Sequence, residues 1–251
     1  MYKHHEESIK NMIEHYRANP EIKALFLIGS IATGTEREDS DIDGVAIVSK
    51  EFHEKKKNNE GLEEVYHGKC TYEGGYFNIH YMTADQLIEI AEKGNDPMRN
   101  MFSCARVLFC DDPDLPLLAA KIPVFQKDDV KNKQFKFYCM FRMFYNYFWL
   151  VCKPEGFMRL HIADGMIYCL YRLILLENEL LFPSMRKLEE YVIKAPDKPN
   201  MIIENCRKFM STLSDEDCKA IVDGYETWTA YDYPKDHYVI MNNFYDPYEG
   251  M

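Results

Sequence analysis

The sequence lacks an excess of positive charge. Its 251 residues carry 30 Lys and Arg against 41 Asp and Glu, which gives a formal net charge of −11. Contacts with phosphates dominate the affinity of proteins for nucleic acids, so this balance argues against a nucleic-acid partner. An acidic surface would instead attract a cationic small molecule.

A long uncharged hydrophobic run is also missing. No span of 18 apolar residues free of charge occurs, and the N-terminal segment MYKHHEESIK has no hydrophobic leader region. We therefore expect no membrane span and a soluble protein of the cytoplasm. The eight cysteines form no C-x-x-C pair and no cluster with histidine at zinc-finger spacing, so we expect reduced thiols.

The pattern of hydrophobic residues changes near Pro123. Before it, apolar runs between turn residues predict strands at about 22–28, 45–48, 64–71, 76–81 and 106–110, with helices at 4–18 and 84–94. After it, helical spacing predicts helices at about 127–151, 158–181, 184–194, 200–211 and 215–230. The expected class is α+β, with a first domain over residues 1–122 and an all-helical bundle domain over residues 126–251.

The most informative segment reads LIGSIATGTEREDSDIDGVAIVS, starting at Leu27. An apolar run ends in Gly29-Ser30, and Asp41 and Asp43 open the next apolar run after a polar loop. Residues i and i+2 of a strand point to the same side, so the two carboxylates share a face. A hard divalent cation with oxygen ligands relieves their repulsion, and a Gly-Ser turn brings backbone N–H groups close to a phosphate. The segment predicts metal-assisted chemistry on a nucleoside triphosphate.

Gly29-Ser30 with Asp41-Ile42-Asp43 resembles the signature of the DNA-polymerase-beta-type nucleotidyltransferase superfamily. That superfamily includes the kanamycin and lincosamide nucleotidyltransferases and the minimal nucleotidyltransferases of toxin–antitoxin pairs. The resemblance implies a nucleotidyltransferase-type mixed β-sheet with helices, an NTP substrate with ATP as the first candidate, and two Mg²⁺ ions with Mn²⁺ as the alternative. It also implies that Asp41 and Asp43 are the metal ligands, and that Gly29 and Ser30 hold the β- and γ-phosphates.

The superfamily pattern generally has a third carboxylate on a later strand, and here the chain departs from it. The position that aligns is Asn78, with His80 next on the same face. Asn78 offers a neutral oxygen to a metal but accepts no proton, whereas His80 can accept one near neutral pH. In kanamycin-type enzymes the base comes from the helical domain, and the resemblance makes Asp164 and Glu177 the candidates here. The alternative for both acids is an ion pair with Arg159 or Arg172.

Four further residues have a functional and a structural interpretation. Ser40 could contribute its hydroxyl to the phosphate site, or it could be only a residue of the turn. Arg99 or Arg106 could neutralise triphosphate charge or form surface ion pairs. Lys187 resembles a polar position in the helical domains of antibiotic nucleotidyltransferases, where it would contact nucleotide or acceptor, with a salt bridge as the alternative.

The segment 135–151 is aromatic and apolar nearly all round. This composition predicts burial, in a core, between domains or in an oligomer interface, and is compatible with a homodimer.

Together these features predict an enzyme that moves a nucleoside monophosphate from an NTP to a hydroxyl of a small-molecule acceptor, with antibiotic-like acceptors as the leading class. One alternative is a catalytically impaired nucleotide-binding regulatory protein, which Asn78 favours. The other is a protein-modifying nucleotidyltransferase of the toxin–antitoxin type, which the long helical domain disfavours.

Overall fold

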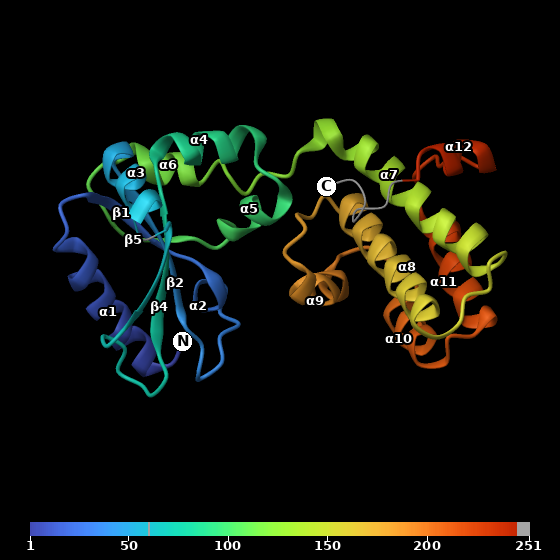
Figure 1. Ribbon diagram of the computed structural model, residues 1–251, viewed down its shortest axis with the longest axis horizontal. Helices are drawn as coiled ribbons and strands as arrows, with labels where there is room; N and C mark the ends of the chain where they lie inside the picture. The colour runs from blue at the N-terminus through green and yellow to red at the C-terminus, as the bar shows by residue number, and fades with distance from the viewer. Residues whose placement is uncertain (60, 245–251) are drawn as a thin grey trace. The chain divides into compact units, whose positions relative to one another are not determined.

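The computed structural model describes residues 1–59 and 61–244. The chain separates into two compact units, Met1–Val124 and Phe125–Met251 (Figure 1). Each unit buries its own hydrophobic clusters, so each is described by itself.

A five-stranded sheet in the order β3-β4-β2-β1-β5 forms the centre of the first unit. Its strands are β1 (Ile22–Leu27), β2 (Ile42–Val48), β3 (Glu63–His67), β4 (Tyr76–Met82) and β5 (Arg106–Cys110). β2 and β4 run parallel, and the other neighbouring strands are antiparallel. The prediction of a mixed sheet in an α+β domain is therefore confirmed. β2 begins at Ile42, which pairs with Phe77, so Asp43 lies inside the strand and Asp41 lies just before it.

Helices pack on both faces of this sheet. They are α1 (Lys3–Arg17), α2 (Gly29–Thr33), α3 (Lys50–Asn59), α4 (Ala84–Lys93), α5 (Asp96–Met101) and α6 (Asp114–Ala119). Alternate residues of β1 enter opposite clusters, as strand geometry requires. Leu25 shares a cluster with Met12 of α1, whereas Phe26 shares one with Leu87 of α4.

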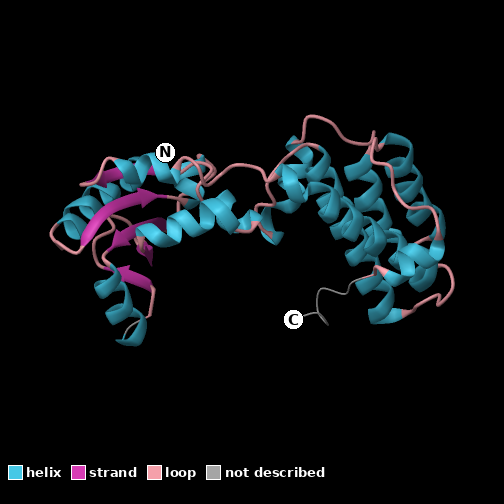
Figure 2. Cartoon of the chain, turned by 90° about the horizontal axis from the view of Figure 1, so that it is seen from above, coloured by secondary structure: helices cyan, strands magenta, loops and turns pink. Residues whose placement is uncertain are grey.

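The second unit is helical, and Figure 2 draws every strand of the described chain within the first unit. Its longer helices are α7 (Val130–Met143), α8 (Gly156–Glu177), α10 (Ile202–Thr212) and α11 (Asp215–Trp228). Its shorter ones are η1 (Lys127–Asp129), η2 (Phe144–Trp149), η3 (Met185–Lys187), α9 (Leu188–Lys194) and α12 (His237–Asn242). The predicted all-helical C-terminal region is confirmed.

The aromatic run near residue 140 is not one regular helix. α7 ends at Met143, and the chain continues as a π-helical segment through Trp149. Such a wide turn rotates the side chains that follow it. Phe141, Phe144 and Trp149 are buried in the core of their own unit, so packing within the unit accounts for the apolar character of these positions.

Among the described residues, no helix is long and apolar enough to cross a bilayer. All eight cysteines are free thiols.

α5 has no counterpart among the predicted elements, and Arg99 explains how it is held. The Arg99 side chain is fully buried. Its guanidinium donates to the carbonyls of Gly94 at 2.8 Å, Ala91 at 2.9 Å and Ile122 at 3.0 Å. Arg99 thereby joins α5 to the end of α4 and to the last segment of the unit.

We predict that Arg99→Met destabilises the first unit by about 3 kcal/mol, because buried carbonyls lose their donors. The midpoint of urea unfolding, followed by far-UV circular dichroism, measures this effect. Arg37→Met is the matched control, since the exposed side chain of Arg37 forms an ion pair with the exposed Asp39. Equal midpoints for the two variants would contradict the role assigned to Arg99.

Candidate active site

The turn after β1 is the first part of the site. The chain enters α2 through Gly29, which has a φ of +72°. The N–H of Ile28 donates to the carbonyl of Asp43 at 3.0 Å and ties this turn to β2. No side chain caps the start of α2, so the N–H groups of its first turn are available to a ligand. Such groups bind phosphate oxygens.

Gly29 lies directly against the Asp43 side chain. A Cβ atom built on Gly29 would be 2.0 Å from Oδ2 of Asp43 and 2.7 Å from its Cγ. The carboxylate therefore occupies the space that any other side chain at position 29 would need. The positive φ independently favours glycine, so the site requires glycine here for two reasons.

The other acidic residue, Asp41, interacts with Tyr76 of β4. Asp41 and Asp43 are both half-buried. The hydroxyl of Tyr76 is hydrogen-bonded to the Asp41 carboxylate, and this bond raises the pKa of Tyr76. Tyr72 donates to the carbonyl of Ser40 at 2.5 Å. The two tyrosines thus hold the loop that presents Asp41.

Ser40 itself lies in the turn before β2. Its Oγ accepts the N–H of Arg37 at 2.9 Å, and its own N–H donates back to the Arg37 carbonyl at 3.2 Å. The side chain is buried. This geometry matches the turn interpretation of Ser40, and a contact with nucleotide stays a prediction.

Asn78 and His80 share the face of β4 that carries Tyr76. The register of the parallel pair sets Asn78 beside Asp43. The Nδ2 of Asn78 donates to Oδ1 of Asp43 at 3.4 Å, and its Oδ1 is buried with no hydrogen-bond partner. His80 lies two residues further along, beside Val45.

These donors fit a divalent cation that prefers oxygen. In residues 1–59 and 61–244, no group of three or more His, Cys, Asp and Glu is placed to hold a metal ion. The site instead offers two carboxylates and an unpartnered amide oxygen, which are hard ligands suited to Mg²⁺ or Mn²⁺. Glu73 is exposed and Asp85 pairs with Lys50, so neither supplies a third carboxylate.

One residue predicted for the nucleotide site lies elsewhere. Arg99 is fully buried, and its guanidinium binds backbone carbonyls, so it has no surface to offer a triphosphate. That prediction is corrected here. Arg106, the alternative, is exposed on β5, and its Nη2 donates to the carbonyl of Ile31 at 2.9 Å. Arg106 therefore places a positive charge beside α2.

Two predicted site residues belong to the second unit. Asp164 is exposed on α8, and Arg159, one of its expected partners, pairs with Asp215 at 3.2 Å instead. Lys187 binds Glu190 at 2.9 Å, which matches the ion-pair interpretation. The catalytic role of Asp164 and the ligand contact of Lys187 stay predictions.

Sequence reasoning missed Tyr72 and Tyr76. A signal for Tyr76 was present, because Tyr76, Asn78 and His80 alternate along one strand and must share a face. Nothing in the local pattern indicates Tyr72, whose contact with Ser40 joins positions 32 residues apart.

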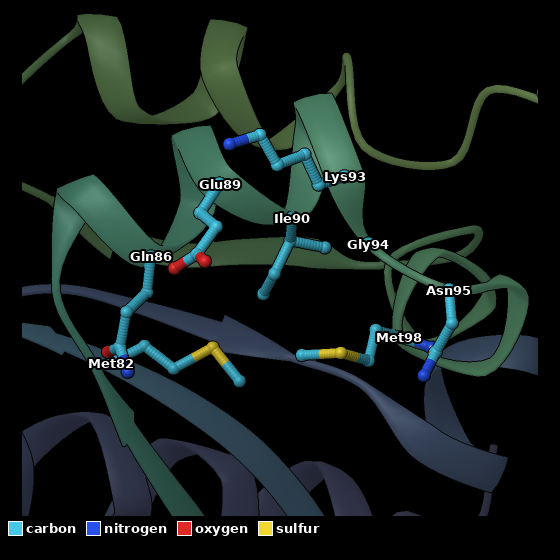
Figure 3. Close-up of a pocket in the computed structure, with 8 residues that line it drawn as sticks. All are labelled: Met82, Gln86, Glu89, Ile90, Lys93, Gly94, Asn95 and Met98. Atoms are coloured by element: carbon cyan, nitrogen blue, oxygen red, sulfur yellow. The ribbon is translucent and has the colours of Figure 1, made fainter.

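A pocket of about 320 Å³ opens further along the same sheet face (Figure 3). Its lining residues are Met82, Gln86, Glu89, Ile90, Lys93, Gly94, Asn95 and Met98. Met82 follows His80 by two residues on β4, so the pocket continues the face of the site. The side chains of Met82 and Met98 point toward each other across it.

The first unit thus combines a mixed five-stranded sheet with a Gly-Ser turn that lies against Asp43. Residues 7–114 match the family model described as polymerase beta, nucleotidyltransferase. Most of the first unit is therefore similar to the polymerase beta nucleotidyltransferases, and this match supports a nucleotidyltransferase activity.

Among solved structures, the chain is similar to a nucleotidyltransferase-like protein from Exiguobacterium sibiricum 255-15. The identity is 14%, the match covers 89% of this chain and 74% of that one, and the TM-score is 0.48. It is also similar to a toxin–antitoxin structure with AMP-PNP, at 16% identity over 46% of this chain and 83% of that one, with a TM-score of 0.26. Both scores lie under 0.5, so neither establishes a detailed correspondence. No curated protein sequence matches the chain.

We predict that Gly29→Ala displaces the Asp43 carboxylate and lowers transferase activity by at least about 100-fold, as small misplacements of reacting groups do. Gly34→Ala is the matched control, because Gly34 has a φ of +70° and a Cβ there would meet nothing within 4 Å. Backbone strain should cost each variant about 1 kcal/mol of stability. Equal activity of the two variants would contradict the contact with Asp43.

Proposed function

We propose that the protein transfers a nucleoside monophosphate from an NTP to a hydroxyl of a small-molecule acceptor, with Mg²⁺ as cofactor. The observation that carries this proposal is the contact between Gly29 and Asp43. It brings a phosphate-binding turn and a metal-binding carboxylate into van der Waals contact, as metal-bound triphosphate requires.

Each residue of the site has a role in this proposal. Asp41 and Asp43 would hold two Mg²⁺ ions, with Mn²⁺ able to replace them, and bound cations supply charge neutralisation at the transferring phosphoryl group. The turn at Gly29 and Ser30 would hold the β- and γ-phosphates with its N–H groups. Arg106 lies beside this turn and would neutralise triphosphate charge in place of Arg99.

The chemical step is an in-line displacement at the α-phosphorus. The acceptor hydroxyl oxygen forms a new bond to phosphorus, the bond to the bridging oxygen of the β-phosphate breaks, and pyrophosphate leaves. The acceptor proton passes to a base. His80 is our candidate within the first unit, since Asn78 accepts no proton. Asp164 is the candidate in the second unit.

The acceptor class follows from charge. A net charge of −11 would attract cationic small molecules and repel nucleic acids, so we propose an antibiotic-like cationic acceptor with ATP as the first candidate nucleotide. The pocket with Glu89 at its wall would accommodate part of such a ligand. A cytoplasmic homodimer stays part of the proposal.

One observation favours a second function. Asn78 stands beside Asp43 where a third carboxylate is expected, and this favours a regulatory protein that binds nucleotide without turnover. Pyrophosphate release separates the two functions, when the protein is incubated with Mg²⁺, ATP or GTP and a panel of aminoglycoside and lincosamide acceptors. Nucleotide binding without pyrophosphate release would favour the regulatory protein.

We predict that Asp41→Asn combined with Asp43→Asn reduces pyrophosphate release to background, because the cations lose both charged ligands. Circular dichroism should show an intact fold, since both side chains are half-buried at the edge of the site. Asp39→Asn is the control, because Asp39 is exposed and pairs with Arg37. Undiminished release by the double variant would contradict the site.

We further predict that Arg106→Ala raises the KM for NTP about tenfold, as the loss of a charge-assisted hydrogen bond to phosphate does. The value of kcat should change less. Arg37→Ala, which removes an exposed arginine of the neighbouring loop, serves as the comparison in steady-state kinetics. Identical KM values for the two variants would remove Arg106 from the nucleotide site.

A further inference from the structure

We propose that Asn78 makes the binding of a divalent metal depend on the nucleotide. This inference rests on the proposed function and concerns the same site. Two observations support it: the Asn78 amide is in register with Asp43, and its Oδ1 is buried without a hydrogen-bond partner. Buried polar atoms without partners are rare in folded proteins, and a missing ligand is one reason for them.

Without metal, the amide relieves the charge of the site. The Nδ2 of Asn78 donates to Oδ1 of Asp43 at 3.4 Å, and Tyr76 is hydrogen-bonded to Asp41. Each carboxylate therefore has a neutral donor beside it. A third carboxylate at position 78 would instead add repulsion against Asp43.

With metal, the same amide can serve as a ligand. The last torsion of an Asn side chain is broad and roughly two-fold, so a half-turn exchanges its nitrogen and oxygen. After this turn, Oδ1 of Asn78 faces the position now taken by Nδ2, next to Asp43. It then offers a neutral oxygen donor to a cation held by Asp41 and Asp43.

The charge of the site follows from this arrangement. Two carboxylates and an amide carry −2, whereas three carboxylates would carry −3. The charge count of the ligands sets the affinity of oxygen sites for divalent cations, so the free protein binds metal weakly. The phosphate oxygens of an NTP at Gly29 and Ser30 supply the missing negative charge. Metal and nucleotide thus enter the site together.

The test is a titration with Mn²⁺, followed by electron paramagnetic resonance of the unbound ion. It is done on the full chain with and without an ATP analogue that cannot be cleaved between the α- and β-phosphates. The affinity of the analogue for Mn²⁺ is first measured without protein. For the wild type with the analogue, we expect Mn²⁺ to bind at least tenfold more tightly than it binds to the analogue alone. Asn78→Asp should tighten binding of Mn²⁺ to the free protein about tenfold. Asn78→Ala should weaken it about tenfold in the nucleotide complex.

Thermal unfolding gives a second measurement that does not depend on activity. Mn²⁺ should raise the Tm of Asn78→Asp more than that of the wild type, because the added carboxylate repels Asp43 until a cation binds. Asn11→Asp is the control for added charge, since Asn11 lies on α1 and binds the carbonyl of Lys69. It should behave as the wild type in both experiments.

Asp43→Asn separates the inference from the proposed function. If Asp43→Asn abolishes Mn²⁺ binding while both Asn78 variants bind as the wild type does, the proposed metal site stands and the role of Asn78 is overturned. If Asp43→Asn leaves Mn²⁺ binding unchanged, the proposed metal site fails, and the inference fails with it.

Discussion

The candidate site depends on one close contact, in which the Asp43 carboxylate fills the space beside the bare Cα of Gly29. The hydrogen bond from the Ile28 N–H to the Asp43 carbonyl holds the two segments at this distance. The parallel register of β2 with β4 then places Asn78 beside the same carboxylate. The Gly-Ser turn, the acidic pair and the amide therefore meet because β1, β2 and β4 are neighbours in the interior of the sheet.

The site has several groups suited to binding a metal and a nucleotide, but it lacks one group expected for catalysis. Asp41, Asp43 and the Asn78 amide lie together, Tyr76 is bonded to Asp41, and Arg106 adds positive charge beside the turn. A carboxylate base is missing from β4. The polymerase beta match supports the reaction class. The choice of acceptor substrate, and the residue that takes the proton from its hydroxyl, depend on side chains outside the motif. The neutral Asn78 lowers the charge that the site must carry without metal.

Much of the fold could be predicted from local patterns, and the differences have identifiable causes. The strands were found because their apolar runs alternate with turn residues. The helix predicted over 215–230 corresponds to α11, which Ser214 caps. α5 was missed because it spans only residues 96–101 and is held by Arg99, whose partners lie up to 25 residues away. Arg99 and Arg106 have the same chemistry in the sequence, and only burial distinguishes the structural arginine from the exposed one.

The sequence by itself predicted that Gly29-Ser30 and Asp41-Ile42-Asp43 belong to one site, because spacing along a strand decides which side chains share a face. It also determined the change from α+β to helical character. Only the tertiary structure decided that the Asp43 side chain contacts Gly29 and that Tyr76 is bonded to Asp41. It also decided that the Oδ1 of Asn78 is buried without a hydrogen-bond partner. These relations depend on strand order and register, which join residues far apart in the chain and leave no local pattern.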